Sequence, residues 1–319
     1  MSFQNYLVIS RLCVSNANAL SSPITIGVPS VTAFMGAVHK LQRILNESVY
    51  NLVKISGVGI VIHDAKLKTF KWKNTEYLVS EGYPIKKNGE RSSTIPSPKI
   101  DMSISLICRI EDDDFQIEKE SCFLKEVDEI LRSKLKIAGG DILPAVDEKG
   151  EVSNSFLETG HLNYFQSIDD YDYGDIRKVI GSVIPGYALI ERRDLIIEEM
   201  EKGNEALDSM VDYLAIHHEC KKDTDGTVKW NKTKKKPGWF VPISVGYQGL
   251  TEPEEAENQR AVGYPHVFGE NLITLGEYIA INSIKCINHI MWEYAFDKEN
   301  SLYKCICNGG KYYGTKERN

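Results

Sequence analysis

The sequence predicts an α+β fold, because strand-like and helix-like segments follow one another in a recognisable order. Six segments carry this pattern, and in chain order they cover residues 6–14, 30–45, 57–63, 101–109, 121–136 and 183–191. The second and fifth repeat apolar side chains at helical spacing, and the other four are β-branched runs or polar–apolar alternations. The resulting order of strand, helix, strand, strand, helix, strand is that of a ferredoxin-like sandwich and of RNA-recognition domains.

The first strand leads through a polar stretch into the best-defined helix of the chain. Residues 15–29 are rich in Asn, Ser, Pro and Gly, and we expect them to form a loop. Pro29 disfavours helix before it, and the Ser30 hydroxyl can cap the first turn. The loop could present short donors beside a helix start, which suits an anion, or it could simply turn the chain.

Later segments are less sharply defined. Residues 81–98 are polar and contain Lys86, Lys87 and Arg91, so they predict either a solvated loop or hairpin, or a basic finger that follows phosphates. Residues 195–218 predict a long helix that Gly203 could break, and residues 270–296 predict another helix. Residues 220–236 are rich in lysine and predict a mobile loop, whose contact with nucleic acid is left open.

Composition limits the classes of function. The net charge of −7 over 319 residues means that any nucleic acid must bind through a local basic surface. We expect a cytoplasmic protein, because no apolar run is long enough for a membrane span and the amino terminus is too polar for a secretory signal. The seven cysteines form no C-x-x-C pair and the chain has no P-loop, so we expect no disulfide, metal, cofactor or nucleotide hydrolysis.

Several collinear motifs resemble one known family over nearly the whole chain. These are residues 11–23 (RLCVSNANALSSP) with 27–30 (GVPS), 57–61 (GVGIV), 138–144 (AGGDILP), 185–189 (PGYAL), 236–243 (KPGWFVPI), 270–272 (ENL) and 275–277 (LGE). The chain thereby resembles the Csy-two subunits, of the Cas-five class, of the type I-F CRISPR surveillance complex.

The resemblance implies a modified ferredoxin-like, RNA-recognition-type fold with an inserted hairpin and a carboxy-terminal extension. We expect a core domain over residues 1–194 and the extension over 195–319. The implied function is non-catalytic: the subunit binds the 5′ handle of CRISPR RNA and pairs with the large subunit to cap a filament of backbone subunits. Target double-stranded DNA near the protospacer-adjacent motif would be met only indirectly, since the guide RNA reads it.

Under this reading, ten residues are candidates for RNA binding. Arg11 and Arg43 would contact phosphates, while Asn16 and Asn18 would read base edges or merely fix the loop. Short donors or close approach of the backbone are expected at Ser21, Ser22, Gly27, Ser30, Gly139 and Gly140. The glycine pair could equally serve only to end the preceding helix.

Two rival readings concern function. Some relatives of this fold cleave CRISPR RNA with a histidine general base, and His39 and His63 are the candidates for that role in this chain. No nucleophile or partner for either histidine is evident in the sequence. A third reading is a structural adaptor that touches only protein, which predicts no protection of RNA by this subunit.

Overall fold

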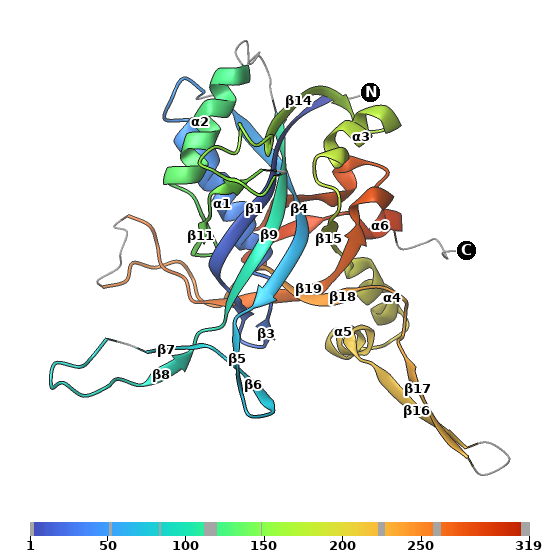
Figure 1. The fold of residues 1–319 in the computed structure, drawn as a ribbon. Helices are drawn as coiled ribbons and strands as arrows, with labels where there is room; N and C mark the ends of the chain where they lie inside the picture. Colours follow the sequence, from blue (N-terminus) through green and yellow to red (C-terminus); the bar gives the residue numbers. More distant parts are fainter. Residues whose placement is uncertain are drawn as a thin grey trace.

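One large antiparallel sheet dominates the computed structural model (Figure 1). Eleven strands take part, in the order β10-β11-β1-β9-β4-β15-β19-β18-β21-β20, with β14 paired to β1 beside β11. The mixed α/β architecture expected from the sequence is therefore present. The structure describes residues 3–50, 53–82, 84–111, 120–147, 149–222, 227–257 and 263–313.

Strand β1 (Phe3–Asn18) lies at the centre of the amino-terminal half of the sheet. It pairs with β9 (Lys99–Glu111) along one edge, and β9 in turn pairs with β4 (Lys54–Leu67). Its other edge holds β14 (Leu162–Asp169) and then β11 (Gly140–Ile142). Tyr6–Ile9 is buried on both faces, which explains why this part of the strand is continuously apolar rather than alternating.

The two helices predicted from periodicity pack against each other and against the sheet. Helix α1 (Val31–Leu45) contacts α2, β4 and β18, and its apolar stripe is buried as predicted. Ser30 is its N-cap, and the side chain accepts from the Thr32 N–H at 3.3 Å. Helix α2 (Glu120–Ser133) confirms the second prediction to within a few residues, and a third helix, α3 (Tyr173–Gly181), contacts β14.

The carboxy-terminal strands extend the same sheet. They are joined by two 3₁₀ turns (Ile281–Ser283 and Ile287–Ile290) and followed by a short helix, α6 (Gly310–Tyr313). Strand β4 pairs with both β15 and β20, so the first and last thirds of the chain meet at its edge. The strands concerned are β15 (Tyr187–Glu191), β18 (Phe240–Gly249), β19 (Gly269–Ala280), β20 (Met291–Asp297) and β21 (Leu302–Cys307).

Three predictions of local structure require correction. Residues 270–296 form no long helix: strands β19 and β20 and the two 3₁₀ turns occupy them, because β19 is held between β15 and β18 by pairing that local periodicity cannot reveal. The segment 195–218 forms two helices, α4 (Arg193–Glu201) and α5 (Ala206–Leu214), with Gly203 at φ +92° between them, so the break that the sequence allowed is present. The correction concerns the end of the segment, because residues 217 and 218 already belong to β16. The lysine-rich segment is a hairpin of β16 (His217–Lys222) and β17 (Val228–Thr233) rather than a loop.

Several hairpins project from the sheet, three of them at its lower end in Figure 1. One of these is the β16–β17 hairpin, and the other two follow β4. Residues 81–98 thus include a hairpin, which fits both a solvated hairpin and a basic finger. The additional short strands are β5 (Thr69–Trp72), β6 (Thr75–Leu78), β7 (Ser80–Gly82), β8 (Thr94–Pro96), β10 (Lys136–Ile137), β12 (Ala145–Val146) and β13 (Val152–Ser153).

A chain of hydrogen bonds links residues of the amino-terminal strands to the 3₁₀ turn and strand near the carboxy terminus. The Arg109 guanidinium donates to Asn288 at 2.7 Å and to Glu293 at 2.6 Å. Asn288 donates to Asp170, which also accepts from the buried Tyr6 hydroxyl. Burial raises the pKa of Asp170, and these donors together with the Arg109 charge oppose that shift. The network therefore fixes the 3₁₀ turn before β20 against β1 and β9.

All seven cysteines are free thiols, and Cys108, Cys286, Cys305 and Cys307 are buried. None of the helices in the described ranges combines the length and apolar character that a membrane span requires. Within those same ranges, no three His, Cys, Asp or Glu side chains cluster closely enough to hold a metal ion.

Glu199 on α4 yields a prediction about pH. It accepts from Lys202 at 2.8 Å and from Lys235 at 2.9 Å, and these hydrogen bonds lower its pKa to about 2. Its contribution to stability should be complete above the usual glutamate pKa of about 4.3 and should disappear as the pH falls towards 2. In urea unfolding, Glu199→Gln should therefore be less stable than wild type at pH 7, and the gap should close on acidification.

The matched control is Glu201→Gln, at an exposed position on the same helix. Its free energy of unfolding should equal that of the wild type at every pH. A destabilisation by Glu199→Gln that stays constant between pH 7 and pH 2 would show that the charge of Glu199 is not what stabilises its contacts with Lys202 and Lys235.

Candidate RNA-binding site

The polar stretch between the first strand and α1 is a small hairpin rather than an open loop. Strand β1 continues to Asn18, and β2 (Leu20–Ser22) then turns back as β3 (Thr25–Ile26) before α1 begins. The expectation of a loop over residues 15–29 was therefore only partly right. Two hollows lie beside this hairpin, and Ser21 lines both of them.

The end of β1 is shaped by two irregularities at predicted site residues. Arg11 and Asn16 have φ values of 55° and 59°, and each lies where the β1–β9 register shifts. The Asn16 N–H and the Ser15 hydroxyl both donate to Asp101 at 2.9 Å. Burial alone would raise the pKa of Asp101. The two donors and Lys68 outweigh this effect and lower the pKa. Asn16 thus anchors the strand end, and its side-chain oxygen accepts from Lys68.

The remaining hairpin residues mainly bond to one another. Asn18 donates to the Leu20 carbonyl at 3.0 Å and accepts from the Leu20 N–H at 3.2 Å. The Ser21 and Ser22 hydroxyls lie 2.8 and 2.6 Å from the Thr25 hydroxyl. These contacts fix the shape of the hairpin, and Ser22 is buried beneath it. At Gly27 and Ser30, the chain passes from the hairpin into α1.

Arg11 and His63 belong to one hydrogen-bonded cluster. The Arg11 guanidinium donates to the Ile184 carbonyl at 2.8 Å, and its backbone N–H donates to the Ser105 hydroxyl at 3.0 Å. His63 Nδ1 lies 2.6 Å from the Pro185 carbonyl, and Nε2 lies 2.6 Å from the Ser105 hydroxyl. Burial and the Arg11 charge lower the pKa of His63, although the Pro185 contact opposes them. The neutral ring therefore donates through Nδ1 and accepts through Nε2, so both of its nitrogens are engaged.

Arg43 lies far from the β2–β3 hairpin, whereas Gly139 and Gly140 lie in a second hairpin that pairs with β1. Arg43 is exposed near the far end of α1, about 20 Å from Ser30 along a helix that rises about 1.5 Å per residue. His39 lies on the same exposed side, with its ring 6.4 Å from that of Tyr294. Gly139 and Gly140 do not end α2. They lie at the turn of the β10–β11 hairpin, which pairs with β1.

The first hollow beside the hairpin is polar. It has a volume of about 430 Å³ and brings together Asn18, Ser21 and Ser30 among the predicted residues. The other lining residues are Leu20, Pro29, Thr32, Ala33, Ala138, Tyr247 and Tyr303. The structure thus groups three of the ten candidates around one open space, with Ala138 of the β10–β11 turn on its rim.

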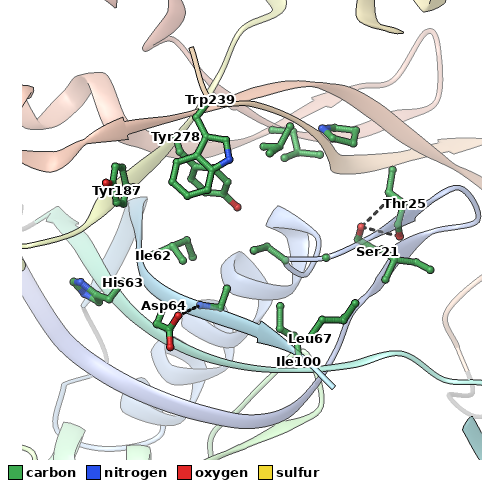
Figure 2. Close-up of a pocket in the computed structure, with 17 residues that line it drawn as sticks. Ser21, Thr25, Ile62, His63, Asp64, Leu67, Ile100, Tyr187, Trp239 and Tyr278 are labelled. Atoms are coloured by element: carbon green, nitrogen blue, oxygen red, sulfur yellow. Dashed lines mark hydrogen bonds between the residues drawn. The ribbon is translucent and has the colours of Figure 1, made fainter. Parts of the chain in front are cut away.

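The second hollow is lined mainly by apolar and aromatic side chains, and we call it the aromatic pocket. Its volume is also about 430 Å³, and Ser21 and Gly27 are the predicted residues that line it. Figure 2 shows Trp239 and Tyr278 on one side, with Ile62 and Asp64 opposite them. A Cβ atom on Gly27 would meet nothing within 4 Å, so the backbone is open to a ligand there.

Comparison with known proteins agrees with the resemblance seen in the motifs. A profile of the family described as "CRISPR-associated protein (Cas_Csy2)" matches residues 7–305. The chain belongs to the Csy2 family. It is also similar to "CRISPR-associated protein Csy2" of Pseudomonas aeruginosa (strain UCBPP-PA14), with 28% identity over 315 residues that cover 93% of this chain and 94% of the relative.

The aromatic residues of this Csy2-family chain were not predicted as site residues. Tyr187 and Trp239 lie in the PGYAL and KPGWFVPI motifs, and Tyr278 directly follows LGE. The motifs themselves were the available signal, since the three aromatic residues sit in or beside them. Sequence reasoning used the motifs for the resemblance but could not bring the three rings together.

Gly140 gives a prediction about the stability of the β10–β11 turn. A Cβ atom there would lie 2.7 Å from the Ala17 nitrogen and the Ser15 oxygen of β1. Gly140→Ala should therefore lower the free energy of unfolding by about 1–3 kcal/mol, as overpacking does. Gly36→Ala, at an exposed position inside α1 with nothing within 4 Å, should instead raise it by about 0.5–1 kcal/mol. Urea unfolding of both variants tests the contrast, and equal effects would contradict it.

Proposed function

We propose that this chain is a non-catalytic subunit of a type I-F CRISPR surveillance complex and that it binds the 5′ handle of CRISPR RNA. One observation carries the proposal: in a chain of the Csy2 family, the hairpin predicted to bind RNA lies between two open hollows. A single-stranded tag can be held by shape, backbone contacts and a few base edges, which such a surface can offer. The complex would act in the cytoplasm.

The strand order supports an RNA-recognition-type core. The order β14-β1-β9-β4, with α1 after β1 and α2 after β9, is that of a ferredoxin-like sheet. In this assignment β14 is the fourth strand of the ferredoxin-like unit, whereas the sequence analysis had given that role to residues 183–191. We assign residues 1–194 to this core with inserted hairpins and residues 195–319 to an extension whose strands continue its sheet.

The charge distribution supports a division between RNA and protein partners. Helix α1 contains His39, Lys40 and Arg43 and no acidic residue, although the whole chain has a net charge of −7. RNA phosphates would meet this helix and the neighbouring hairpin, and acidic surfaces elsewhere would face the large subunit, the backbone subunits or solvent. Target DNA near its flanking motif would be met only through the assembled complex.

The environment of the two histidines favours binding over cleavage. A general base needs a free nitrogen within reach of the attacking hydroxyl. Both nitrogens of His63 are engaged, Nδ1 with the Pro185 carbonyl and Nε2 with the Ser105 hydroxyl, so neither is free to take a proton from an attacking hydroxyl. His39 faces Tyr294, which offers no carboxylate to orient it. An endoribonuclease of the same fold superfamily is therefore the weaker alternative.

The binding proposal predicts selective losses of affinity for handle RNA. Asn18→Ala should raise the Kd about three- to tenfold, because it removes the side chain that fixes the hairpin and borders the polar hollow. Arg43→Ala should have a similar effect, and one that weakens as salt rises. Asn163→Ala is the matched control, since Asn163 also donates to a nearby carbonyl, that of Gly160 at 2.8 Å, but lies on β14. Fluorescence anisotropy with the full chain measures all three.

Unchanged affinity in Asn18→Ala and Arg43→Ala would remove these residues from the site. If crosslinking in the assembled complex joins no handle nucleotide to this chain, the adaptor reading replaces the proposal.

The non-catalytic assignment predicts that the purified chain leaves labelled repeat RNA intact over hours. Gel electrophoresis of the incubated RNA is the measurement. A specific product that is lost in His39→Ala or His63→Ala would reverse the assignment and establish the endoribonuclease reading.

A further inference from the structure

Three aromatic side chains from distant parts of the chain converge in the aromatic pocket. Tyr187 begins β15, Trp239 precedes β18, and Tyr278 belongs to β19. The Trp239 ring lies 5.2 Å from Tyr187 at 73° and 5.1 Å from Tyr278 at 63°. Such edge-to-face contacts hold the indole in a fixed orientation. Yet Trp239 remains 53% exposed and Tyr187 42% exposed, so the cluster is not simply core.

The opposite wall of the pocket gives it the shape of a slot. Ile62, Leu67 and Ile100 form apolar parts of this wall, and Figure 2 shows them across the open space from Trp239. An indole facing aliphatic side chains suits a flat, apolar body such as a ring. The volume of about 430 Å³ is more than one ring requires and leaves room for the sugar at the mouth.

Polar side chains line parts of this slot, and one of them, His63, already has both ring nitrogens engaged. The exposed Asp64 carboxylate lies at one end and accepts from the Ala65 N–H at 2.9 Å through only one of its oxygens. Ser21 and Thr25 of the hairpin lie at another end. A nucleobase matches this arrangement, because its faces are apolar and its edges carry donors and acceptors.

We propose that the aromatic pocket holds one unstacked base of single-stranded RNA, stacked on Trp239, with the Asp64 carboxylate accepting from the amino group on its edge. This inference rests on the proposed function, and it adds a base-specific subsite to it. A carboxylate can only accept, so the pocket favours adenine, cytosine and guanine, which carry an exocyclic amino group, over uracil, which does not.

The test is a double-mutant cycle between RNA and protein. Handle RNAs that carry a single abasic nucleotide at each position in turn are titrated against the full chain. One position should lose about five- to a hundredfold in affinity, the range for base–aromatic stacking. With Trp239→Leu, the same abasic RNA should show no further loss relative to intact RNA, and Trp239→Phe should restore part of the effect. Trp230→Leu, at an exposed position on β17, is the control and should retain the full abasic penalty.

The outcomes separate the two proposals. If the chain binds handle RNA but no abasic position couples to Trp239, the base subsite is wrong and the proposed function stands. If the chain binds no RNA, alone or within the complex, the proposed function fails and the subsite with it. A third outcome, in which Trp239→Leu leaves RNA binding intact but releases a partner subunit from the complex, would assign the pocket to a protein side chain and overturn the inference.

Asp64→Asn tests the specificity separately. An amide can donate as well as accept, so uracil at the coupled position should bind Asp64→Asn about as well as the amino-bearing bases do. In the wild-type chain, uracil there should bind more weakly than those bases. The abasic scan of the wild-type chain changes only the RNA, so misfolding of a variant cannot imitate its result. Equal affinity of the wild-type chain for all four bases at that position would remove Asp64 from the subsite.

Discussion

The pairing of β1 along both of its edges is the constraint on which the rest of the structure depends. Strand β9 occupies one edge, and β14 followed by β11 occupies the other, so β1 has no free edge over most of its length. The chain can leave the sheet only where this pairing ends, near Asn18, and the β2–β3 hairpin begins there. The bulges at Arg11 and Asn16 keep these residues close to Ser105 and Asp101 on β9. The position of the hairpin between two hollows follows from this arrangement.

Elements with local signals could be predicted from the sequence. Ser30 caps α1 because a proline and a hydroxyl adjoin an apolar stripe of helical period, and all of these features are within a few residues of one another. The strand at residues 270–280 could not be predicted in the same way. The spacing of its apolar side chains fits both a helix and a strand. Only pairing with β15 and β18, which are distant in sequence, makes it extended.

In the candidate site, too, features set by neighbouring residues could be predicted, and features set by residues distant in sequence could not. Polar residues near β1 were predicted correctly to lie together at a strand-to-helix junction, but Asn18, Ser21 and Ser22 use their side chains first to hold their own turn. The aromatic pocket was missed because Tyr187, Trp239 and Tyr278 meet only after three strands have paired. Sequence reasoning located the polar segment but expected a loop there, whereas the shape of the surface around the hairpin is a property of the whole sheet.

The contact between β4 and β20 has a consequence for how this protein is made. Gly59 pairs with Met291, and Val58 pairs with Trp292, so one edge of β4 stays unpaired until residues much later in the sequence have been synthesised. Pairing across such a separation closes slowly and leaves apolar strand edges open in the meantime. A nascent or truncated chain would expose those edges to the ribosome, chaperones and its own copies.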